Sequence, residues 1–364
     1  PDDCKGWFIT QEAGIQVHWL PVPYSNHMSY NQRIASFFKF AWGAARKGAS
    51  LLADVVFATS TPLTIALPGV YAARRQKVPM VFEVRDLWPE LPIAMGALRN
   101  PLTRLAAQRL ERFAYQSSAE IVALSPGMAD GVVKTGFPAS RVTEIPNSSD
   151  LDLFYPNDEC RAAFRAKQGI SPEQVLVLYT GTFGRINGVG YLPQLAAALA
   201  HDRRFRFMTV GEGQEFTEVK AAAQNLGVLN KNLHMLGRLS KADMPRVLAA
   251  ADIATSLFIP LPAMESNSAN KFFDGLAAGC CMAINYGGWQ AEILRETGAG
   301  LQLDRDVTIA ARQLQELADY PQRLAQAKIA ARKLAEERFS RDKLAAQLEQ
   351  LLLRAVANHP SRHR

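Results

Sequence analysis

Short runs of β-branched residues alternate with helical patterns along most of this chain, in two successive series. The first series has predicted strands at residues 55–59, 80–84, 120–124 and 142–145, with helices predicted between them at 63–75, 102–117 and 127–134. The second has predicted strands at 175–180, 205–210, 233–236, 253–257 and 282–284, with helices centred near Leu195, Val219, Val247, Phe273 and Ile293. Strands joined by helices run parallel, because each helix returns the chain to the starting edge. The predicted fold class is therefore α/β, with two doubly wound parallel-sheet domains facing a cleft.

A stretch rich in Pro, Asn and Asp, residues 155–158, interrupts the alternation and is interpreted as a linker. It predicts an N-terminal domain over residues 1–156 and a C-terminal domain over 157–338. Residues 307–357 are helical in pattern throughout, as three helices, and the last, 339–357, is expected to pack back on the first domain. Residues 358–364 are expected to be a disordered tail. The chain opens in a strand-like region, so we expect a first strand upstream of the given sequence.

Composition fits this picture of two globular domains. The chain has 364 residues, 48% of them hydrophobic and 21% charged, which is too long for one ordinary domain and unlike a disordered protein. Lys and Arg exceed Asp and Glu by 41 − 34 = 7. That excess favours anionic partners but is too small to indicate a nucleic-acid binder, so no nucleic-acid partner is expected.

The cysteines and the longest uncharged segment indicate where the protein resides. No two cysteines have the spacing of metal ligands, which favours a reduced, cytosolic protein; they are Cys4, Cys160, Cys280 and Cys281. The uncharged run at residues 55–73 approaches the length of a membrane span, but Pro62 and Pro68 interrupt it. We interpret the run as a strand, a turn and a helix.

The loop at residues 180–188 follows the first strand of the second series. Gly181, Gly184 and Gly188 would let the backbone approach a phosphate closely, and Arg185 has a guanidinium suited to phosphate oxygens. The glycine spacing is not that of the usual dinucleotide-binding fingerprint. An ordinary tight turn with a surface arginine is an equally good interpretation.

A second loop, residues 262–274, also joins a strand to a helix. Ser266, Asn267 and Ser268 are typical N-cap residues, which predicts a helix that begins near residue 269. Lys271 and Asp274 then share one helix face, where the cation suits a pyrophosphate and the carboxylate suits ribose hydroxyls. The alternative is a capped surface helix with an ordinary Lys–Asp pair.

Three further loops are candidates on weaker grounds. Glycines at 211 and 213 and at 287 and 288 permit close approach of a ligand, but simple turns explain them equally well. In residues 83–90 charged side chains, including Arg85 and Asp86, directly follow a strand of buried character. These charges suit the edge of a cleft, or a structural Arg–Asp pair at the end of the sheet.

Five segments carry, in order, a resemblance to a known family: residues 82–90, 123–128, Pro146-Asn147 with Phe154, 179–182 and 268–274. Together they resemble glycosyltransferase family 4, retaining enzymes of the GT-B fold that move a sugar from a nucleotide diphosphate. The resemblance runs from about Pro21 to the last helix. It is greatest to the bacterial branch that builds O-antigen and related lipopolysaccharide chains, including transferases for N-acetylfucosamine-type sugars. It implies two Rossmann-like domains, an acceptor-side one first and a nucleotide-sugar-binding one second.

The resemblance implies the site residues, with departures from the family pattern. Arg85-Asp86 stand where the family commonly has His-Asp; Thr182 and Asn187 match a diphosphate-binding Arg and Lys; Ser266 and Asp274 match a Glu pair. The expected catalytic residues, which stabilise the leaving diphosphate or face the sugar, are Arg185, Lys271, Arg85 and Asp86. The expected donor-binding residues are Gly181, Thr182, Gly184, Asn187, Gly211, Gly237, Arg238, Ser266, Asn267, Ser268, Asn270 and Asp274. Neither a metal site nor a cofactor is expected; the donor is a substrate, by family habit linked to UDP.

The resemblance also implies the acceptor, a polyprenyl-diphosphate-linked or free saccharide. Residues 13–53 contain no Asp or Glu but carry four cations among the aromatic residues Phe37, Phe38, Phe40 and Trp42. Such a helix suits an anionic membrane surface, which predicts a cytoplasmic protein peripheral to the inner face of the plasma membrane. The alternative is a half-buried helix whose aromatic side chains belong to the core. Two other functions stay open, a nucleotide-sugar 2-epimerase of the same fold and a non-catalytic nucleotide-sugar-binding protein.

Overall fold

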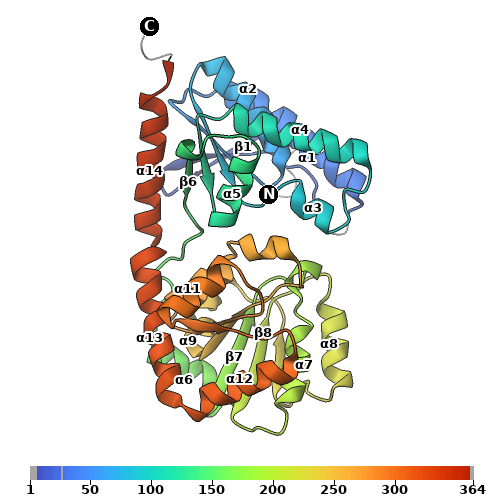
Figure 1. Ribbon diagram of the computed structural model, residues 1–364, viewed down its shortest axis with the longest axis vertical. Helices are drawn as coiled ribbons and strands as arrows, with labels where there is room; N and C mark the ends of the chain where they lie inside the picture. Colours follow the sequence, from blue (N-terminus) through green and yellow to red (C-terminus); the bar gives the residue numbers. More distant parts are fainter. Residues whose placement is uncertain (1–5, 26–27, 361–364) are drawn as a thin grey trace. The chain divides into compact units, whose positions relative to one another are not determined.

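The computed structural model describes residues 6–25 and 28–360, so Cys4 and residues 361–364 of the expected tail lie outside the described part of the chain. The chain forms two compact units (Figure 1). The first comprises Pro1–Ile145 and Gln347–Arg364, and the second comprises Pro146–Ala346. The division falls upstream of the linker predicted at residues 155–158. Residues 155–157 of that stretch have no regular secondary structure. Helix α6 (Asp158–Lys167) begins directly after them, because the Asn157 side chain accepts a hydrogen bond from the Cys160 N–H at 2.8 Å.

The first unit is built on a four-stranded sheet in which strand order follows chain order. Its parallel strands are β3 (Val56–Thr59), β4 (Met80–Val84), β5 (Glu120–Ala123) and β6 (Val142–Glu144). The connecting helical segments are η1 (Leu63–Ile65), α2 (Ala66–Gln76), α3 (Glu90–Ala94), α4 (Pro101–Gln116), α5 (Pro126–Lys134) and η2 (Ala139–Arg141). The middle strands β4 and β5 are largely buried, as parallel strands covered on both faces are.

A separate hairpin and a long helix precede this sheet. Strands β1 (Phe8–Glu12) and β2 (Ile15–Trp19) are antiparallel, so the rule of parallel strands does not extend to them. Ala13 and Gly14 join them with positive φ angles of 47° and 83°, as a two-residue hairpin turn requires. Helix α1 (Tyr30–Ala49) begins after Ser29, which exchanges hydrogen bonds with Gln32 in a capping box.

The second unit is built on a six-stranded parallel sheet of order β12-β11-β10-β7-β8-β9. Its strands are β7 (Val175–Thr180), β8 (Phe205–Val210), β9 (Leu233–Leu236), β10 (Ile253–Ser256), β11 (Cys281–Ile284) and β12 (Gly300–Gln302). The connecting segments are η3 (Arg185–Asn187), α7 (Tyr191–Ala198), α8 (Phe216–Asn225), η4 (Lys241–Asp243), α9 (Met244–Ala250), η5 (Pro262–Ser266), α10 (Asn270–Ala277) and α11 (Trp289–Thr297). The chain order reverses between β7 and β10, and ligands of open parallel sheets bind beyond the strand ends at such a point.

Helices cover both faces of this sheet. On one face Val177 and Tyr179 of β7 are fully buried in a core with residues of α7 and α8. On the other face α10 lies close to β10 and β11, since a Cβ added at Gly275 would lie 2.5 Å from Met282 Sδ and 3.0 Å from Ala254 Cβ. Gly275 therefore fixes how closely α10 approaches the sheet.

A buried ion network ties α6 to the amino end of β10. Asp252 accepts hydrogen bonds from Arg161 at 2.7 Å, from Arg165 at 3.0 Å and from the Leu176 N–H at 2.9 Å. Arg165 and Asp252 are only 4% and 6% exposed, so their charges depend on each other for stabilisation.

The three helices predicted at the C-terminus are α12 (Val307–Asp319), α13 (Pro321–Arg338) and α14 (Arg341–Ala357). The last part of α14 belongs to the first unit, where Arg354 donates hydrogen bonds to both carboxylate oxygens of Glu120, at 3.1 and 3.0 Å. Each described helix is too short or too polar to cross a lipid bilayer.

Candidate functional site

The carboxyl ends of β7 and β8 are joined by main-chain packing between their loops. The Gly181 N–H donates to the Val210 carbonyl at 3.0 Å, and the Phe183 N–H donates to the Glu212 carbonyl at 2.9 Å. A Cβ added at Gly211, whose φ is +146°, would lie 1.9 Å from the Gly181 carbonyl oxygen. Packing of one loop on the other therefore accounts for the glycine at 211, without a ligand.

Lys271 lies in the first turn of α10 and reaches the loop after β7. Its ammonium donates a hydrogen bond to Asn187 Oδ1 at 2.9 Å and lies 3.4 Å from the Tyr179 hydroxyl. The same nitrogen lies 4.9 Å from the centre of the Tyr179 ring and 5.0 Å from the centre of the Phe258 ring. Two aromatic rings and one amide thus surround the charge.

Among the residues that the structure describes, no carboxylate balances this charge. In the described part of the chain Lys271 forms no ion pair, and Asp274, three residues along the helix, does not pair with it. The alternative prediction of an ordinary Lys–Asp pair is therefore wrong. Burial lowers the pKa of the Lys271 ammonium to about 7, because it removes water from the charged form without supplying an anion in return. A partly buried, unpaired cation of this kind suits an anionic ligand.

The other two cations expected at this edge are placed differently. Arg185 belongs to η3 and is exposed, with no ion pair to another residue that the structure describes. Arg238 is also exposed, and its main-chain N–H lies 3.5 Å from Glu212 Oε1. With the described residues neither guanidinium forms a hydrogen bond or an ion pair, in contrast to the hydrogen-bonded ammonium of Lys271.

The remaining glycines and Thr182 form the rim of the same loops. A Cβ at Gly181 would lie 3.3 Å from the Tyr179 hydroxyl and 3.9 Å from Lys271 Nζ, and a Cβ at Gly184 would lie 3.3 Å from Asn187 Nδ2. Thr182 is exposed, and its carbonyl accepts a hydrogen bond from the Tyr179 hydroxyl at 2.9 Å. Gly237 is exposed beside Glu212, since its added Cβ would lie 3.6 Å from Glu212 Oε1.

The N-capping predicted for α10 is wrong in detail. The N-cap is Ala269, and no side chain caps the helix. Ser268 instead accepts a hydrogen bond from the Asn147 N–H at 3.1 Å, so its hydroxyl is directed to the start of the second unit. Asn267 accepts from the Ala269 N–H at 3.2 Å, and the Asn267 carbonyl accepts from Trp289 Nε1 at 2.8 Å. These contacts fix the chain immediately before the helix.

As a result α10 presents an uncapped N-terminus. Its first residue, Asn270, is exposed. Ser266, four residues before Asn270, is the last residue of η5. An uncapped helix start leaves main-chain N–H groups that favour an anion.

Asp274 faces a different neighbourhood from Lys271, with Ser149, Asp150 and Lys241 around it. Burial raises the pKa of the Asp274 carboxyl to about 6, with Asp150 adding to the increase and the Ser149 hydroxyl and Lys241 opposing it. A partly buried carboxyl that accepts few hydrogen bonds retains acceptor capacity for ligand hydroxyls.

Glu265 is a carboxylate at this edge that sequence reasoning did not select. Its carbonyl oxygen would lie 2.3 Å from a Cβ at Gly288, and its Oε1 would lie 3.5 Å from a Cβ at Gly287. The paired glycines therefore make room for Glu265. Glu265 directly precedes Ser266, the residue matched to the first Glu of the family pair. Allowing that match to shift by one residue would have selected Glu265 from the sequence.

Arg85 and Asp86 belong to the first unit, after β4. The Arg85 N–H donates to Ser60 Oγ at 3.0 Å, and its guanidinium lies 3.5 Å from Glu83. Asp86 accepts a hydrogen bond from the Thr61 hydroxyl at 2.8 Å. Burial raises the pKa of the Asp86 carboxyl, and this effect outweighs the hydrogen bond and the nearby Arg85, which both lower the pKa. Hydroxyls and carboxylates thus line the carboxyl end of this sheet. Within the residues that the structure describes, no group of three or more His, Cys, Asp or Glu is arranged to hold a metal ion.

Two models of known protein families match this chain. Residues 1–148 match the model of a glycosyl transferase 4-like domain, and residues 161–334 match that of glycosyl transferases group 1. The chain has the GT-B fold of glycosyltransferases. The fold class predicted from the sequence, two parallel-sheet α/β domains of this type, is thereby confirmed.

Solved glycosyltransferase structures resemble this GT-B chain over most of its length. Anabaena HepE in complex with UDP superposes with a TM-score of 0.71 and 17% identity, covering 87% of this chain and 82% of that one. Sucrose-phosphate synthase from Thermosynechococcus elongatus superposes with a TM-score of 0.78 and 14% identity, covering 98% and 86%. WaaG, a glycosyltransferase involved in lipopolysaccharide biosynthesis, superposes with a TM-score of 0.66 and 18% identity, covering 90% and 85%. At such identities the likeness concerns the fold.

A sequence relative matches over a shorter stretch. EpsF of Bacillus subtilis, a protein named as a candidate glycosyltransferase, is 28% identical over 96 residues. The match covers 26% of this chain and spans about a quarter of that protein's length.

Proposed function

We propose that this GT-B protein transfers a sugar from a nucleotide diphosphate, retaining the configuration at the anomeric carbon. The observation that carries the proposal is the unpaired Lys271 ammonium at the carboxyl edge of the second sheet, beside the uncapped start of α10. A diphosphate supplies the anion that both features lack. HepE, a protein of the same fold, has been solved with UDP and with UDP-glucose, and we therefore propose UDP as the nucleotide.

The position of Lys271 also compensates for a departure from the family pattern. Where family 4 enzymes carry a diphosphate-binding lysine, this chain has Asn187, and Lys271 Nζ is 2.9 Å from that side chain. The ammonium thus reaches the expected place from α10 instead of from the loop. Arg185, exposed on η3 two residues before Asn187, is proposed to close on the diphosphate when the donor is bound.

In the proposed reaction the bond between the anomeric carbon and the diphosphate oxygen breaks, and the nucleoside diphosphate leaves with the electron pair. Lys271, Arg185 and the N–H groups of α10 stabilise the negative charge that develops on the leaving group. The acceptor hydroxyl forms the new bond to the anomeric carbon on the same face and gives its proton to the departing phosphate. Asp274 is proposed to hold the ribose, and the strand-end residues Arg85 and Asp86 to face the reacting sugars.

The donor assignment is tested by replacing Lys271 with methionine, which keeps the length of the side chain and removes its charge. Transfer of radiolabelled sugar should fall about 10²–10³-fold, the usual effect of losing one charge-stabilising donor. Lys220→Met, on the exposed face of α8, removes a charge elsewhere in the same unit and should leave transfer unchanged. Near-normal transfer by Lys271→Met would contradict the proposal.

The same assay separates the other candidate functions. A non-catalytic binding protein would bind the donor without any transfer, and a 2-epimerase would convert the donor sugar without an acceptor. Family habit suggests an N-acetylated amino sugar as the group transferred, and bacterial lipopolysaccharide or O-antigen chains as the product.

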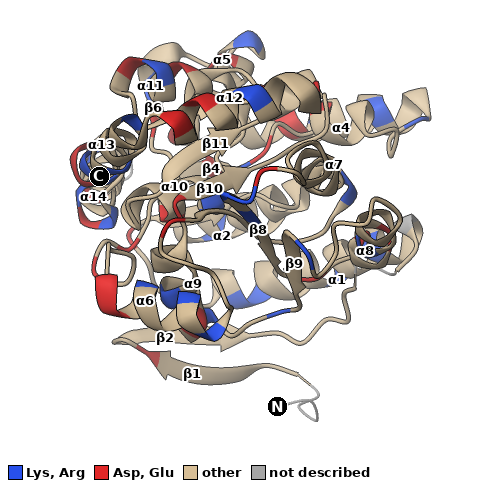
Figure 2. Ribbon diagram, turned by 90° about the horizontal axis from the view of Figure 1, so that it is seen from below, with Lys and Arg blue, Asp and Glu red and all other residues tan. Residues whose placement is uncertain are grey.

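We further propose that the acceptor is a polyprenyl-diphosphate-linked saccharide, met at the inner face of the plasma membrane by helix α1. Trp42 is 65% exposed and Phe38 51% exposed, so these aromatic side chains are not the core residues of the alternative interpretation. Lys39 and Lys47 lie on the same helix, and the Arg46 guanidinium is 4.7 Å from the centre of the Trp42 ring (basic residues are blue in Figure 2). Exposed aromatic residues beside cations are typical of helices that bind anionic bilayers.

Co-sedimentation with vesicles tests this surface. Wild-type protein should pellet with phosphatidylglycerol vesicles and much less with neutral phosphatidylcholine vesicles, because the cations contribute to binding. Trp42→Ser should reduce pelleting, whereas Tyr320→Ser should not, since Tyr320 is an aromatic residue of the second unit with similar exposure, 55%. Equal pelleting of both variants with the wild type would contradict a role for α1.

A further inference from the structure

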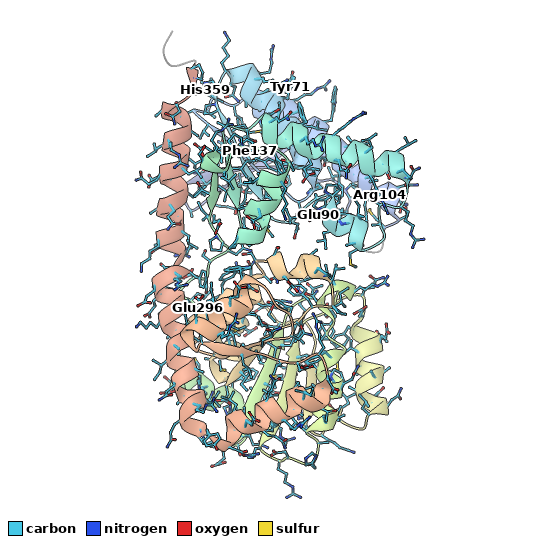
Figure 3. All side chains as sticks on the ribbon, in the orientation of Figure 1. Tyr71, Glu90, Arg104, Phe137, Glu296 and His359 are labelled. Carbon is cyan, nitrogen blue, oxygen red and sulfur yellow. The ribbon has the colours of Figure 1, made fainter. Side chains whose placement is uncertain are left out.

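A pocket of about 280 Å³ opens in the first unit at the amino ends of β4 and β5, the opposite edge of the sheet from Arg85 and Asp86. Val70 and Met80 form part of its apolar lining. Arg74, in the last turn of α2, and Lys77, which directly follows that helix, also line it. His359, two residues after the end of α14, completes this side of the pocket (labelled in Figure 3). Its volume is just below the range of about 300–1,000 Å³ typical of sites for drug-sized ligands, so it suits a small one.

The polar lining of the pocket is basic and lacks acidic residues. Neither Arg74 nor Lys77 forms an ion pair with any residue in the described ranges. The Arg74 guanidinium forms a cation–π contact with the Phe113 ring, 5.7 Å from the ring centre. Two cations without counter-charges, beside the hydroxyl-bearing Ser117, provide hydrogen-bond donors for an anion.

Lys77 adds a conformational argument. It closes α2 with a left-handed backbone, φ 56° and ψ 43°. At this position glycine is the favoured residue, because a Cβ crowds the backbone in that conformation. The chain therefore carries a lysine where local geometry favours glycine, and departures of this kind are expected where a side chain has a function.

The helix dipole alone does not explain both cations. Cations in a last helical turn are favoured by the carbonyl groups that end the helix, and Arg75 also fills that role in α2. Arg75 is exposed like Arg74 but does not line the pocket. Arg74 and Lys77 thus line the cavity, whereas Arg75 only provides a cation at the end of the helix.

We propose that this pocket binds a small phosphate monoester with an apolar substituent. The phosphate is held by Arg74 and Lys77, and the apolar group lies against Val70 and Met80. This site belongs to the first unit alone and is independent of the proposed donor site.

The test is calorimetric titration of the whole chain with butyl phosphate, inorganic phosphate and butanol. Butyl phosphate should bind more tightly than either of the others, because it alone supplies both the anion and the apolar group. Lys77→Gly and Arg74→Gln should each weaken its binding about tenfold or more. Lys77→Gly should keep or raise the melting temperature, since glycine suits the backbone, so its loss of binding cannot be attributed to unfolding.

Arg75→Gln is the matched control and should bind butyl phosphate like the wild type. Equal losses in Arg75→Gln and Arg74→Gln, or no binding of butyl phosphate by the wild type, would overturn the site. Equal affinity for inorganic and butyl phosphate would overturn the apolar part of the ligand. Vesicles of phosphatidic acid in place of butyl phosphate distinguish a lipid source from a soluble ester. Lys271→Met should leave this binding unchanged, which separates the pocket from the donor site.

Discussion

Donor binding to the second unit should depend on pH through Lys271. The ammonium is the form that binds a diphosphate, and its pKa in the free protein is about 7 because burial disfavours the charge. A UDP-sugar keeps both phosphates as diesters, so the ligand itself does not titrate near neutrality. Any change of affinity between pH 6 and pH 8 then comes from groups of the protein that gain or lose a proton.

The magnitude follows from the fraction of Lys271 that is protonated. With a pKa of about 7 this fraction is roughly nine-tenths at pH 6 and one-tenth at pH 8. Since the apparent Kd varies inversely with the competent fraction, the Kd for the donor should rise about tenfold over this range. Binding at pH 8 should also take up close to one proton, because the diphosphate raises the pKa of the ammonium.

Isothermal titration with a UDP-sugar at pH 6, 7 and 8, in buffers of different ionisation enthalpy, measures both quantities. Lys271→Met should bind weakly at all three values with no proton uptake. Asp274, whose pKa is about 6, also loses its proton in this range but mostly below pH 7, so the change between pH 7 and pH 8 is the one assigned to Lys271. A Kd that does not rise between pH 7 and pH 8 in the wild type, or an equal rise in Lys271→Met, would refute the reasoning.

Four further predictions concern stability and the origin of the charge. Lys271→Met should raise the free energy of unfolding by about 1–3 kcal/mol at pH 7 without donor, because the folded protein no longer holds an uncompensated charge. The difference between the variant and the wild type should shrink as the pH rises from about 7 to 10.5, because over this range the unfolded wild-type chain binds a proton at Lys271 that the folded chain does not. Transferring the charge with the double variant Asn187→Lys/Lys271→Asn should restore part of the donor affinity lost in Lys271→Asn, measured by titration; no recovery would show that the two positions are not equivalent. Gly211→Ala should lower the free energy of unfolding by about 1–3 kcal/mol in urea, since its Cβ would overlap the Gly181 carbonyl; Gly190→Ala, with nothing within 4 Å, is the control. Asp252→Asn should lower the free energy of unfolding by about 3–5 kcal/mol because it leaves Arg165 buried without a counter-charge. Removing the exposed partner of Arg246 by Asp243→Asn should leave the free energy of unfolding close to that of the wild type.

The sequence predicted the two sheets well because their strands are buried on both faces. Such strands read as short apolar runs between helical patterns, and all the strands of both sheets except β12 were predicted at their places. Strand β12, with three residues, and helix α3, with five, are too short to show a period. The start of α6 was not predicted, because Pro156-Asn157-Asp158 is equally typical of a loop and of a helix start, and only the contact between Asn157 and Cys160 distinguishes the two.

The candidate site was predictable to the level of residue type and loop. Lys271 stood out by its position after a strand, but its aromatic neighbours Tyr179 and Phe258 come from distant strands and could not be assigned from spacing. The prediction of an N-cap for α10 failed for a related reason. Ser268 has the chemistry of an N-cap, yet tertiary contact with Asn147 directs its hydroxyl elsewhere.

The central claim is that Lys271 holds the diphosphate of a nucleotide sugar, and a crystal structure with a bound UDP-sugar tests it most directly. A phosphate oxygen within about 3.2 Å of Lys271 Nζ is the predicted result. A diphosphate bound elsewhere, with the ammonium still hydrogen-bonded only to Asn187 and Tyr179, would contradict it.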